Sequence, residues 1–201
     1  MKTMVSKLLW VIGGGFFSFA FLQYGPPSIR NGVSTVLVPG AISSSLKKLD
    51  PAFAKKVKTL IERLDKKGHS VRIQTTYRSK KRQDLLYDIT QFGKRLGVRQ
   101  MYTKARGGES CHNRESNGEP SSYAVDLWGY PFGPEIHISD SLVKKHADFF
   151  KVMGKEAVAL GLGWGGNFSR YDEAGNPKSI WTRYKIGWDP PHVYDSRCKT
   201  P

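Results

Sequence analysis

The chain has 201 residues, of which 39% are hydrophobic and 12% aromatic, so its composition excludes a disordered chain and allows one domain with its own core. Its 32 lysines and arginines outnumber the 17 acidic residues and give a formal net charge of +15. A surplus of this size attracts polyanions such as nucleic acid, acidic lipid or an anionic cell wall. The charge alone does not choose among them.

The N-terminus has the layout of a secretory signal. Lys2 and Lys7 precede an uncharged apolar stretch at 8–22, which is long for a cleaved signal and slightly short for a spanning helix of about 20 residues. No Ala-x-Ala cleavage site follows, so we expect residues 1–24 to be a signal peptide or an uncleaved membrane anchor. The basic start predicts that the rest of the chain is exported to the periplasm or the extracellular space.

Residues 25–49 are expected to be a linker, which opens with Gly-Pro-Pro-Ser, and a lead-in segment. The predicted domain covers 50–201. Its first helix begins with Asp50 as N-cap and Pro51 at the first helical position, and Gly68 is suited to end it. The helix presents one apolar face, made of Phe53, Val57, Leu60, Ile61 and Leu64.

The remaining elements are predicted from hydrophobic periodicity and from turn residues. In chain order they are a strand at 71–76, a helix at 79–92, a loop at 103–122, a strand at 123–128, a helix at 140–160 and a turn at 161–166 that leads to the last strands. This order favours an α+β domain with helices packed on a central antiparallel sheet.

Two histidines and one carboxylate, His112, Asp126 and His192, are the candidate metal ligands. Imidazole and carboxylate groups suit Zn²⁺, and three protein ligands leave a fourth position open for water, which is typical of catalytic zinc. Asp189 lies three residues before His192, and its carboxylate could take a proton from water at the metal. The pattern therefore predicts a zinc hydrolase.

Each of these residues also has a plainer interpretation. His137, between two isoleucines, is the rival ligand, whereas His69 and His146 are expected to be structural or exposed. Asp126 could instead be a carboxylate at a strand end that is hydrogen-bonded within the fold and binds no metal. Asp189 could be a turn residue before two prolines, although those prolines would also fix its carboxylate relative to the next histidine.

Two cysteines, Cys111 and Cys198, each lie within six residues of a proposed ligand histidine. In an oxidising compartment they could form a disulfide that ties the C-terminal tail to the site. Two free thiols are the equally open alternative.

Five stretches resemble, in the same order, the peptidase M15 family of zinc peptidases. They are Tyr-Arg-Ser at 77–79, the loop at 105–112, Ala-Val-Asp-Leu at 124–127, Gly-Leu-Gly-Trp-Gly-Gly at 161–166 and Asp-Pro-Pro-His at 189–192. The family contains D-alanyl-D-alanine carboxypeptidases and L-alanyl-D-glutamate endopeptidases that cut the peptide stems of bacterial cell walls, and many members are phage endolysins. The last two stretches look closer to the endopeptidase branch.

The resemblance implies a hedgehog/DD-peptidase-like fold and a role for each matching residue. His112, Asp126 and His192 would bind Zn²⁺, and Asp189 would be the general base. Arg78 would stabilise the oxyanion or hold a substrate carboxylate, for which a planar guanidinium is suited, unless it is merely an ion-pair partner. Ser110 would contact substrate. Trp164 would shape the site or pack beside it.

One departure from the family pattern separates the first two ligands. Residues 113–125 lie between them where the family has a shorter spacing with a glycine, and Ser122 takes the place of that glycine. The extra piece at 113–120 is expected to be a looped insertion, which costs little entropy and could reshape substrate access.

The preferred hypothesis is thus a zinc peptidase that hydrolyses peptidoglycan stem peptides. We expect it to be monomeric, to bind anionic cell-wall polymers through its basic surface, and to contact a membrane through its N-terminal segment. The alternative is a non-catalytic cell-wall-binding module in which zinc is structural and the insertion blocks the cleft. Specific nucleic-acid binding is not expected, because no nucleic-acid motif accompanies the charge.

Overall fold

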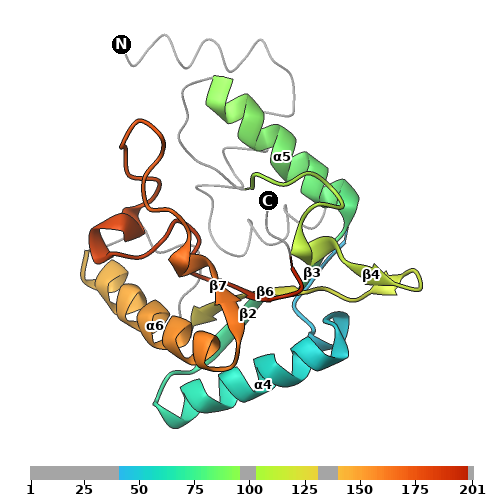
Figure 1. Cartoon of the computed structure of the whole chain (residues 1–201), viewed down its shortest axis with the longest axis horizontal. Coiled ribbons are helices and arrows are strands. Elements are labelled where there is room, and N and C mark those ends of the chain that lie inside the picture. The colour runs from blue at the N-terminus through green and yellow to red at the C-terminus, as the bar shows by residue number, and fades with distance from the viewer. Residues whose placement is uncertain (1–40, 96–102, 131–139, 199–201) are drawn as a thin grey trace. The chain divides into compact units, whose positions relative to one another are not determined.

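The computed structural model of the chain describes residues 41–95, 103–130 and 140–198 (Figure 1). The predicted signal or anchor at 1–24 and the rival ligand His137 lie outside these ranges. Within the described ranges, no helix is both long and apolar enough to cross a membrane. Membrane attachment through the N-terminus therefore stays a prediction.

The first helix of the domain, α4 (Pro51–Lys66), forms where the sequence predicts it. The Asp50 carboxylate accepts hydrogen bonds from the amides of Ala52 and Phe53, both at 3.1 Å, and so caps the helix. Gly68 follows the helix with a φ of +79°, a left-handed conformation that favours glycine. The buried face consists of Phe53, Val57, Leu60 and Leu64.

A four-stranded antiparallel sheet lies at the centre of the fold, which confirms the predicted α+β class. Its order is β2 (Val71–Thr75), β6 (Ala124–Gly129), β8 (His192–Asp195) and β7 (Leu162–Trp164). All three strand pairings are antiparallel. Strand β7 corrects the sequence prediction of a turn at 161–166, because Leu162, Gly163 and Trp164 pair with β8 in extended conformation.

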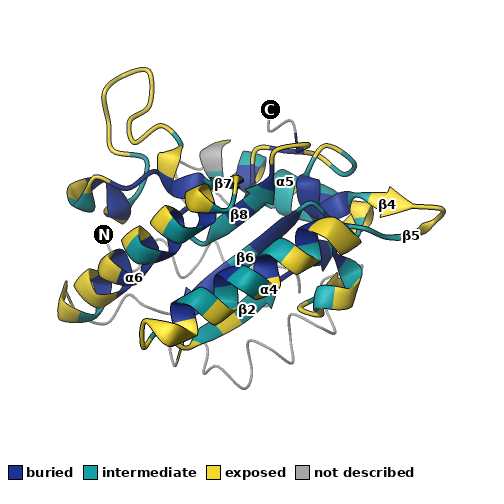
Figure 2. Ribbon diagram, turned by 60° about the horizontal axis from the view of Figure 1, so that its bottom comes forward, coloured by how far each residue is buried: buried dark blue, intermediate teal, exposed yellow. Residues whose placement is uncertain are grey.

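Helices α4 and α6 (Asp140–Ala159) cover one face of this sheet. α4 packs on α6 and β2, and α6 packs on β6 and β7. Figure 2 shows the inner faces of both helices buried and their outer faces exposed. The centre of this layer is aromatic: the ring of Phe150 lies 5.2 Å from that of Trp128 and 5.2 Å from that of Trp181.

The segments that precede the proposed ligands are more structured than the sequence indicates. Helix α5 (Lys80–Arg95) extends three residues past its predicted end and buries polar side chains, among them Gln83 and Thr90. Before it, β3 (Tyr77–Arg78) pairs with β1 (Ile42–Ser43). The loop predicted at 103–122 contains a short 3₁₀ helix and a two-stranded hairpin.

The short 3₁₀ helices are η1 (Leu46–Lys48), η2 (Cys111–Asn113), η3 (Gly165–Asn167) and η4 (Ile180–Tyr184). The hairpin consists of β4 (Glu115–Ser116) and β5 (Glu119–Pro120). Its turn residues Asn117 and Gly118 both have positive φ, 52° and 79°, as in the two-residue loops that connect the strands of a hairpin. The predicted insertion is therefore an ordered hairpin that projects from the domain (Figure 2).

Candidate active site

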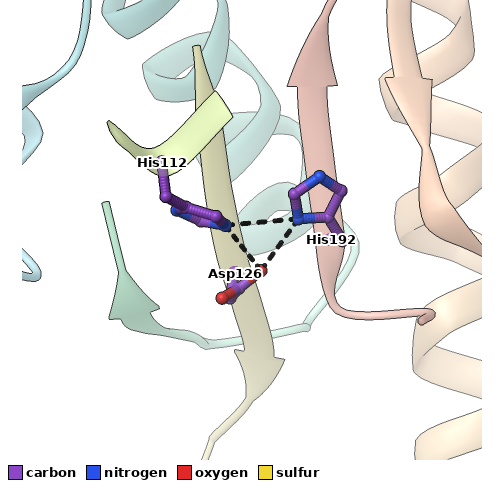
Figure 3. A group of neighbouring side chains, drawn as sticks. All are labelled: His112, Asp126 and His192. Atoms are coloured by element: carbon purple, nitrogen blue, oxygen red, sulfur yellow. Dashed lines mark hydrogen bonds and ion pairs between the residues drawn. The ribbon is translucent and has the colours of Figure 1, made fainter. Parts of the chain in front are cut away.

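The three proposed metal ligands converge on one point (Figure 3). The Nδ1 atom of His192 lies 3.1 Å from Oδ1 of Asp126, and 3.3 Å from Nε2 of His112. The Nε2 atom of His112 lies 3.4 Å from the same Asp126 oxygen. These are the only three His, Cys, Asp or Glu side chains grouped closely enough for a metal among the described residues.

Strand alternation explains why the site lies on the sheet face opposite α4 and α6. Val125 and Leu127 of β6 and Val193 of β8 belong to the apolar core under the helices. Successive side chains of a strand point to opposite faces, so Asp126 and His192 point to the other face. They are also direct partners across the β6–β8 ladder, which brings their side chains together.

His112 comes from η2, and its neighbours fix its ring. Nδ1 of His112 lies 3.2 Å from the carbonyl oxygen of Thr76, which leaves Nε2 to face the other two ligands. The Ser110 side chain accepts a hydrogen bond from the His112 amide and caps η2. Metal-binding histidines commonly donate a hydrogen bond to a backbone carbonyl from the ring nitrogen that does not bind the metal. This bond fixes the tautomer and orientation of the ring.

The distances among the three ligand atoms fit a zinc ion. Zinc binds histidine nitrogen and carboxylate oxygen at about 2.0–2.2 Å in tetrahedral sites, so neighbouring ligand atoms lie about 3.3–3.6 Å apart. The three separations of 3.1, 3.3 and 3.4 Å are close to that spacing. Nitrogen donors also favour zinc over magnesium or calcium, which prefer oxygen.

Asp189 lies in the same cleft as the ligands, a hollow of about 430 Å³ that Arg78 and Ser110 also line. Burial raises the pKa of Asp189 to about 6; the nearby Asp126 adds to the rise, while His192 and Arg78 oppose it. A carboxylate with a pKa near neutrality is suited to exchange protons at physiological pH. Asp189 is also the first residue of a turn, in which its carbonyl accepts a hydrogen bond of 3.2 Å from the amide of His192.

The three ligands perturb one another as well. Burial would raise the pKa of Asp126, but His112 and His192 outweigh it and hold that pKa well below the usual range. Burial lowers the pKa of the His112 ring, although Asp126 opposes the shift. The cluster therefore favours an ionised Asp126 carboxylate and a neutral His112, the protonation states that bind a metal. Burial would lower the pKa of His192, but the hydrogen bond to Asp126 and the charge of Asp189 raise it in the metal-free site.

The segment that carries Asp189 and His192 rests on the end of strand β7. The indole Nε1 of Trp164 donates a hydrogen bond of 2.8 Å to the carbonyl of Pro190. A Cβ atom on Gly165 would lie 2.1 Å from the carbonyl oxygen of Asp189, so glycine is needed for this close approach. The prediction that Trp164 packs beside the site is consistent with this contact.

Arg78 reaches the cleft from strand β3, where it forms an ion pair. Its Nη2 lies 3.8 Å from Oδ2 of Asp126, and its Nη1 donates to Oε1 of Gln83 at 2.8 Å. Its Nε is buried without a hydrogen-bond partner among the described residues. The guanidinium thus pairs with the proposed ligand Asp126 at the edge of the cleft.

The hairpin of β4 and β5 is anchored beside the site without covering it. The hydroxyl of Tyr77 donates a hydrogen bond of 2.7 Å to Glu115, and burial together with this acidic partner raises the pKa of Tyr77 to about 12. None of the described residues that line the cleft belongs to 113–120. The blocked cleft required by the binding-module alternative is not observed.

Cys111 and Cys198 form a disulfide, which settles the question that the sequence left open. Cys111 precedes the ligand His112, and Cys198 follows strand β8, which carries His192. The bond therefore links the two segments that supply the histidine ligands. The pairing was not predictable from spacing, because 87 residues separate the two cysteines.

Sequence reasoning missed several residues of the cleft wall. Lys104, Phe168, Ser169 and Trp188 all line it. The rings of Phe168 and Trp188 lie in tilted contact, with their centres 5.7 Å apart. The only signal for them was their nearness in sequence to the recognised motifs, because aromatic and lysine side chains in loops have no periodicity.

The other described histidines take no part in the site, as expected. The ring of His69 lies 5.9 Å from that of Phe149, and the ring of His146 lies 5.7 Å from that of Trp128. Both are far from the ligand cluster in the fold, at a separate hollow that they line together.

Residues 46–126 match the family model described as VanY, D-alanyl-D-alanine carboxypeptidase. The matched segment contains the proposed ligands His112 and Asp126. Asp189 and His192 lie beyond it, so their assignment depends on the geometry of the site. No curated protein matches the chain.

A solved structure of the LdcB LD-carboxypeptidase, reported to reveal the molecular basis of peptidoglycan recognition, is similar to this chain with 21% sequence identity and a TM-score of 0.44. The match covers 73% of this chain and 58% of that one, so this chain spans less than two thirds of that protein. The VanY match, over residues 46–126, supports the resemblance to the M15 family found in the sequence motifs.

Proposed function

We propose that the protein is a zinc peptidase that hydrolyses peptide bonds of the peptidoglycan stem. The observation that carries the proposal is the cleft in which three ligand atoms lie 3.1 to 3.4 Å apart, and which Asp189 and Arg78 also line. A structural zinc site would not need a free carboxylate and a guanidinium in an open cleft.

Each residue has a distinct task in this proposal. Zinc, when bound, polarises a carbonyl group and lowers the pKa of water from 15.7 to about 7. His112, Asp126 and His192 would hold the ion. The Asp189 carboxylate would accept a proton from the attacking water and pass it to the leaving amine, and the Arg78 guanidinium would stabilise the developing oxyanion or bind a substrate carboxylate.

The family description favours removal of a terminal D-alanine, whereas the closing sequence motifs resemble the endopeptidase branch. Both reactions use the same ligands and base, so the site supports either of them. The bond that is cut is therefore a matter for product analysis.

The disulfide and the charge support the proposed location at the cell wall. Disulfides persist in exported proteins and are rare in the reducing cytosol. The net charge of +15 suits binding to anionic wall polymers. We propose that the protein is exported and acts there as a monomer, held at the membrane if residues 8–22 are retained.

The test is mass spectrometry of purified peptidoglycan after incubation with the full chain, with added zinc, with a chelator, and with the Asp189→Ala variant. We expect peptide products only with the zinc-loaded wild type, and the masses of the products identify the bond. Absence of products from folded, zinc-loaded protein would favour the non-catalytic binding module.

A further inference from the structure

Gln74 is a polar residue of the cleft that the proposed reaction does not use. It belongs to strand β2, is half-buried, and lines the cleft together with the proposed ligands. No hydrogen bond joins its carboxamide to another residue that the structure describes. A carboxamide offers one acceptor oxygen and two N–H donors, so this side chain can still bind a polar group of a substrate.

An irregularity in the pairing of β2 with β6 places Gln74 beside the proposed metal site. Ile73 of β2 pairs with Leu127. The adjacent residue of β6, Asp126, pairs with Thr75 and not with Gln74. Gln74 is thus an extra residue in β2, as in a β-bulge, and bulges next to active sites commonly redirect a side chain. The bulge therefore lies directly opposite a proposed metal ligand.

The fold holds the backbone on both sides of Gln74. Ile73 packs against the apolar core, and Thr75 is buried. The side chain of Gln74 therefore projects into the cleft from a fixed point. A group that is held in this way loses less conformational entropy when it binds a ligand than a mobile one does.

The other neutral side-chain oxygens of the cleft already accept hydrogen bonds within the protein. The hydroxyls of Thr103 and Ser110 accept bonds of 2.7 and 3.3 Å, and the hydroxyl of Ser169 accepts one as well. These hydroxyls and Gln74 are the neutral side-chain oxygens among the described residues that line the cleft. The carboxamide oxygen of Gln74 is therefore the one that is left for a substrate.

The two carboxylates of the cleft have other tasks. Asp126 contacts two histidines and Arg78, and Asp189 is the proposed base. A peptide substrate nevertheless brings N–H groups into the cleft, and an N–H that loses its bond to water is costly to leave unpaired. The N–H closest to the reaction belongs to the residue that supplies the scissile carbonyl, because only its Cα atom lies between the two groups. Substrates of both candidate reactions have this N–H.

We propose that the carboxamide oxygen of Gln74 accepts a hydrogen bond from the N–H of the residue that supplies the scissile carbonyl. The bond holds the substrate backbone beside the metal and makes the site selective for an amide at that position. The same substrate with an ester there binds less well. This inference rests on the proposed function, because it takes the cleft to be the peptide site.

The test compares an N-acetylated stem pentapeptide with an analogue in which an ester oxygen replaces this N–H. The replacement removes the donor and leaves the length of the peptide nearly unchanged. The wild-type full chain gives kcat/KM, and calorimetry on the zinc-loaded full chain with Asp189→Asn gives the dissociation constants. We expect the amide to be preferred roughly five- to tenfold in both quantities. Gln74→Met, similar in size, should reduce the preference to about twofold or less.

Two variants serve as controls. Gln74→Glu keeps an acceptor oxygen at the same place. Gln91→Met makes the matched substitution on helix α5, at a described residue that does not line the cleft. Both variants should keep the preference for the amide. If Gln74→Met does not fold, Gln74→Val removes the same oxygen with a residue that suits a strand.

Equal constants for the two substrates in the wild type would overturn the inference. A full preference in folded Gln74→Met, or an equal loss of preference in Gln91→Met, would also overturn it. Preferential binding of the amide without hydrolysis of either substrate would instead refute the proposed peptidase and leave the Gln74 contact supported. If folded, zinc-loaded protein neither binds nor hydrolyses either substrate, both proposals are wrong.

Discussion

At the scale of single residues, Asp189 has the environment of a general base. Its pKa is raised to about 6, so its carboxyl is ionised above that pH, and a bound cation nearby would lower the pKa from this value. The base can accept a proton only when ionised. Activity should therefore fall as the pH falls through about 6 or slightly below.

We expect Asp189→Asn to lower kcat/KM about 10²- to 10⁴-fold, because a carboxamide cannot accept the proton. The variant should still bind one zinc ion, since the three ligands are intact. The measurement is the pH profile of kcat/KM for both proteins with metal content determined in parallel. A variant that keeps most of its activity, with the same acid limb, would show that another group is the base.

His146 links the stability of the domain to pH. The ring is 1% exposed and packs against Trp128, and burial lowers its pKa to about 4 from an ordinary 6.5. Below pH 6.5 the unfolded chain binds a proton at this residue that the folded chain resists. Its stabilising contribution is therefore complete above pH 6.5 and is lost as the pH falls toward 4.

We expect the metal-free wild type to lose about 1–3 kcal/mol of unfolding free energy through His146 between pH 7 and pH 4. The His146→Phe variant should lose less over the same range. Urea denaturation at several pH values in the presence of a chelator measures the difference. Parallel pH curves for the two proteins would mean that His146 titrates normally in the folded state.

At the scale of elements, strand β7 supports the segment that carries the base and the last ligand. We expect Trp164→Phe to weaken zinc binding and to lower kcat, because it removes the hydrogen bond to the Pro190 carbonyl. The matched control is Trp128→Phe, since the Nε1 of this buried indole has no hydrogen-bond partner among the described residues.

Both substitutions should destabilise the domain, by about 1–3 kcal/mol, through lost packing. Only the Trp164 variant should change the zinc dissociation constant, by roughly tenfold or more. Competition with a zinc chelator measures that constant. Equal zinc affinities in the two variants would show that β7 packs beside the segment without positioning it.

The disulfide acts at the same scale, because it connects η2 with the chain that follows β8. Its removal in the double variant Cys111→Ser and Cys198→Ser should lower the unfolding free energy by about 2–4 kcal/mol. Zinc affinity should fall as well, since the segments of His112 and His192 are then tied less firmly. Thermal unfolding with and without zinc measures both effects, and an unchanged midpoint would contradict the account.

At the scale of the whole molecule, the sequence predicted the elements whose signals are local. The Asp50 cap, the apolar face of α4 and the strand at 123–128 each follow from neighbouring residues, and each is present in the structure. The motif order also predicted which residues form the ligand cluster.

Features that depend on distant contacts were not predictable from the sequence. Strand β7 looked like a turn because four glycines crowd 161–166, and its extended form comes from pairing with β8. The hairpin at β4 and β5 has a local signal in its Asn117-Gly118 turn, but its contact with Tyr77 beside the site comes from the fold. The contact between Phe168 and Trp188, which lie twenty residues apart in the sequence, forms only in the fold.

The central claim is that His112, Asp126 and His192 hold one zinc ion in the cleft beside Asp189. The most direct measurement is anomalous X-ray diffraction at the zinc absorption edge from crystals of the zinc-loaded protein. The account predicts a single strong peak at about 2.0–2.2 Å from Nε2 of His112, a carboxylate oxygen of Asp126 and Nδ1 of His192. Zinc bound only elsewhere, or no zinc at full loading, would contradict it.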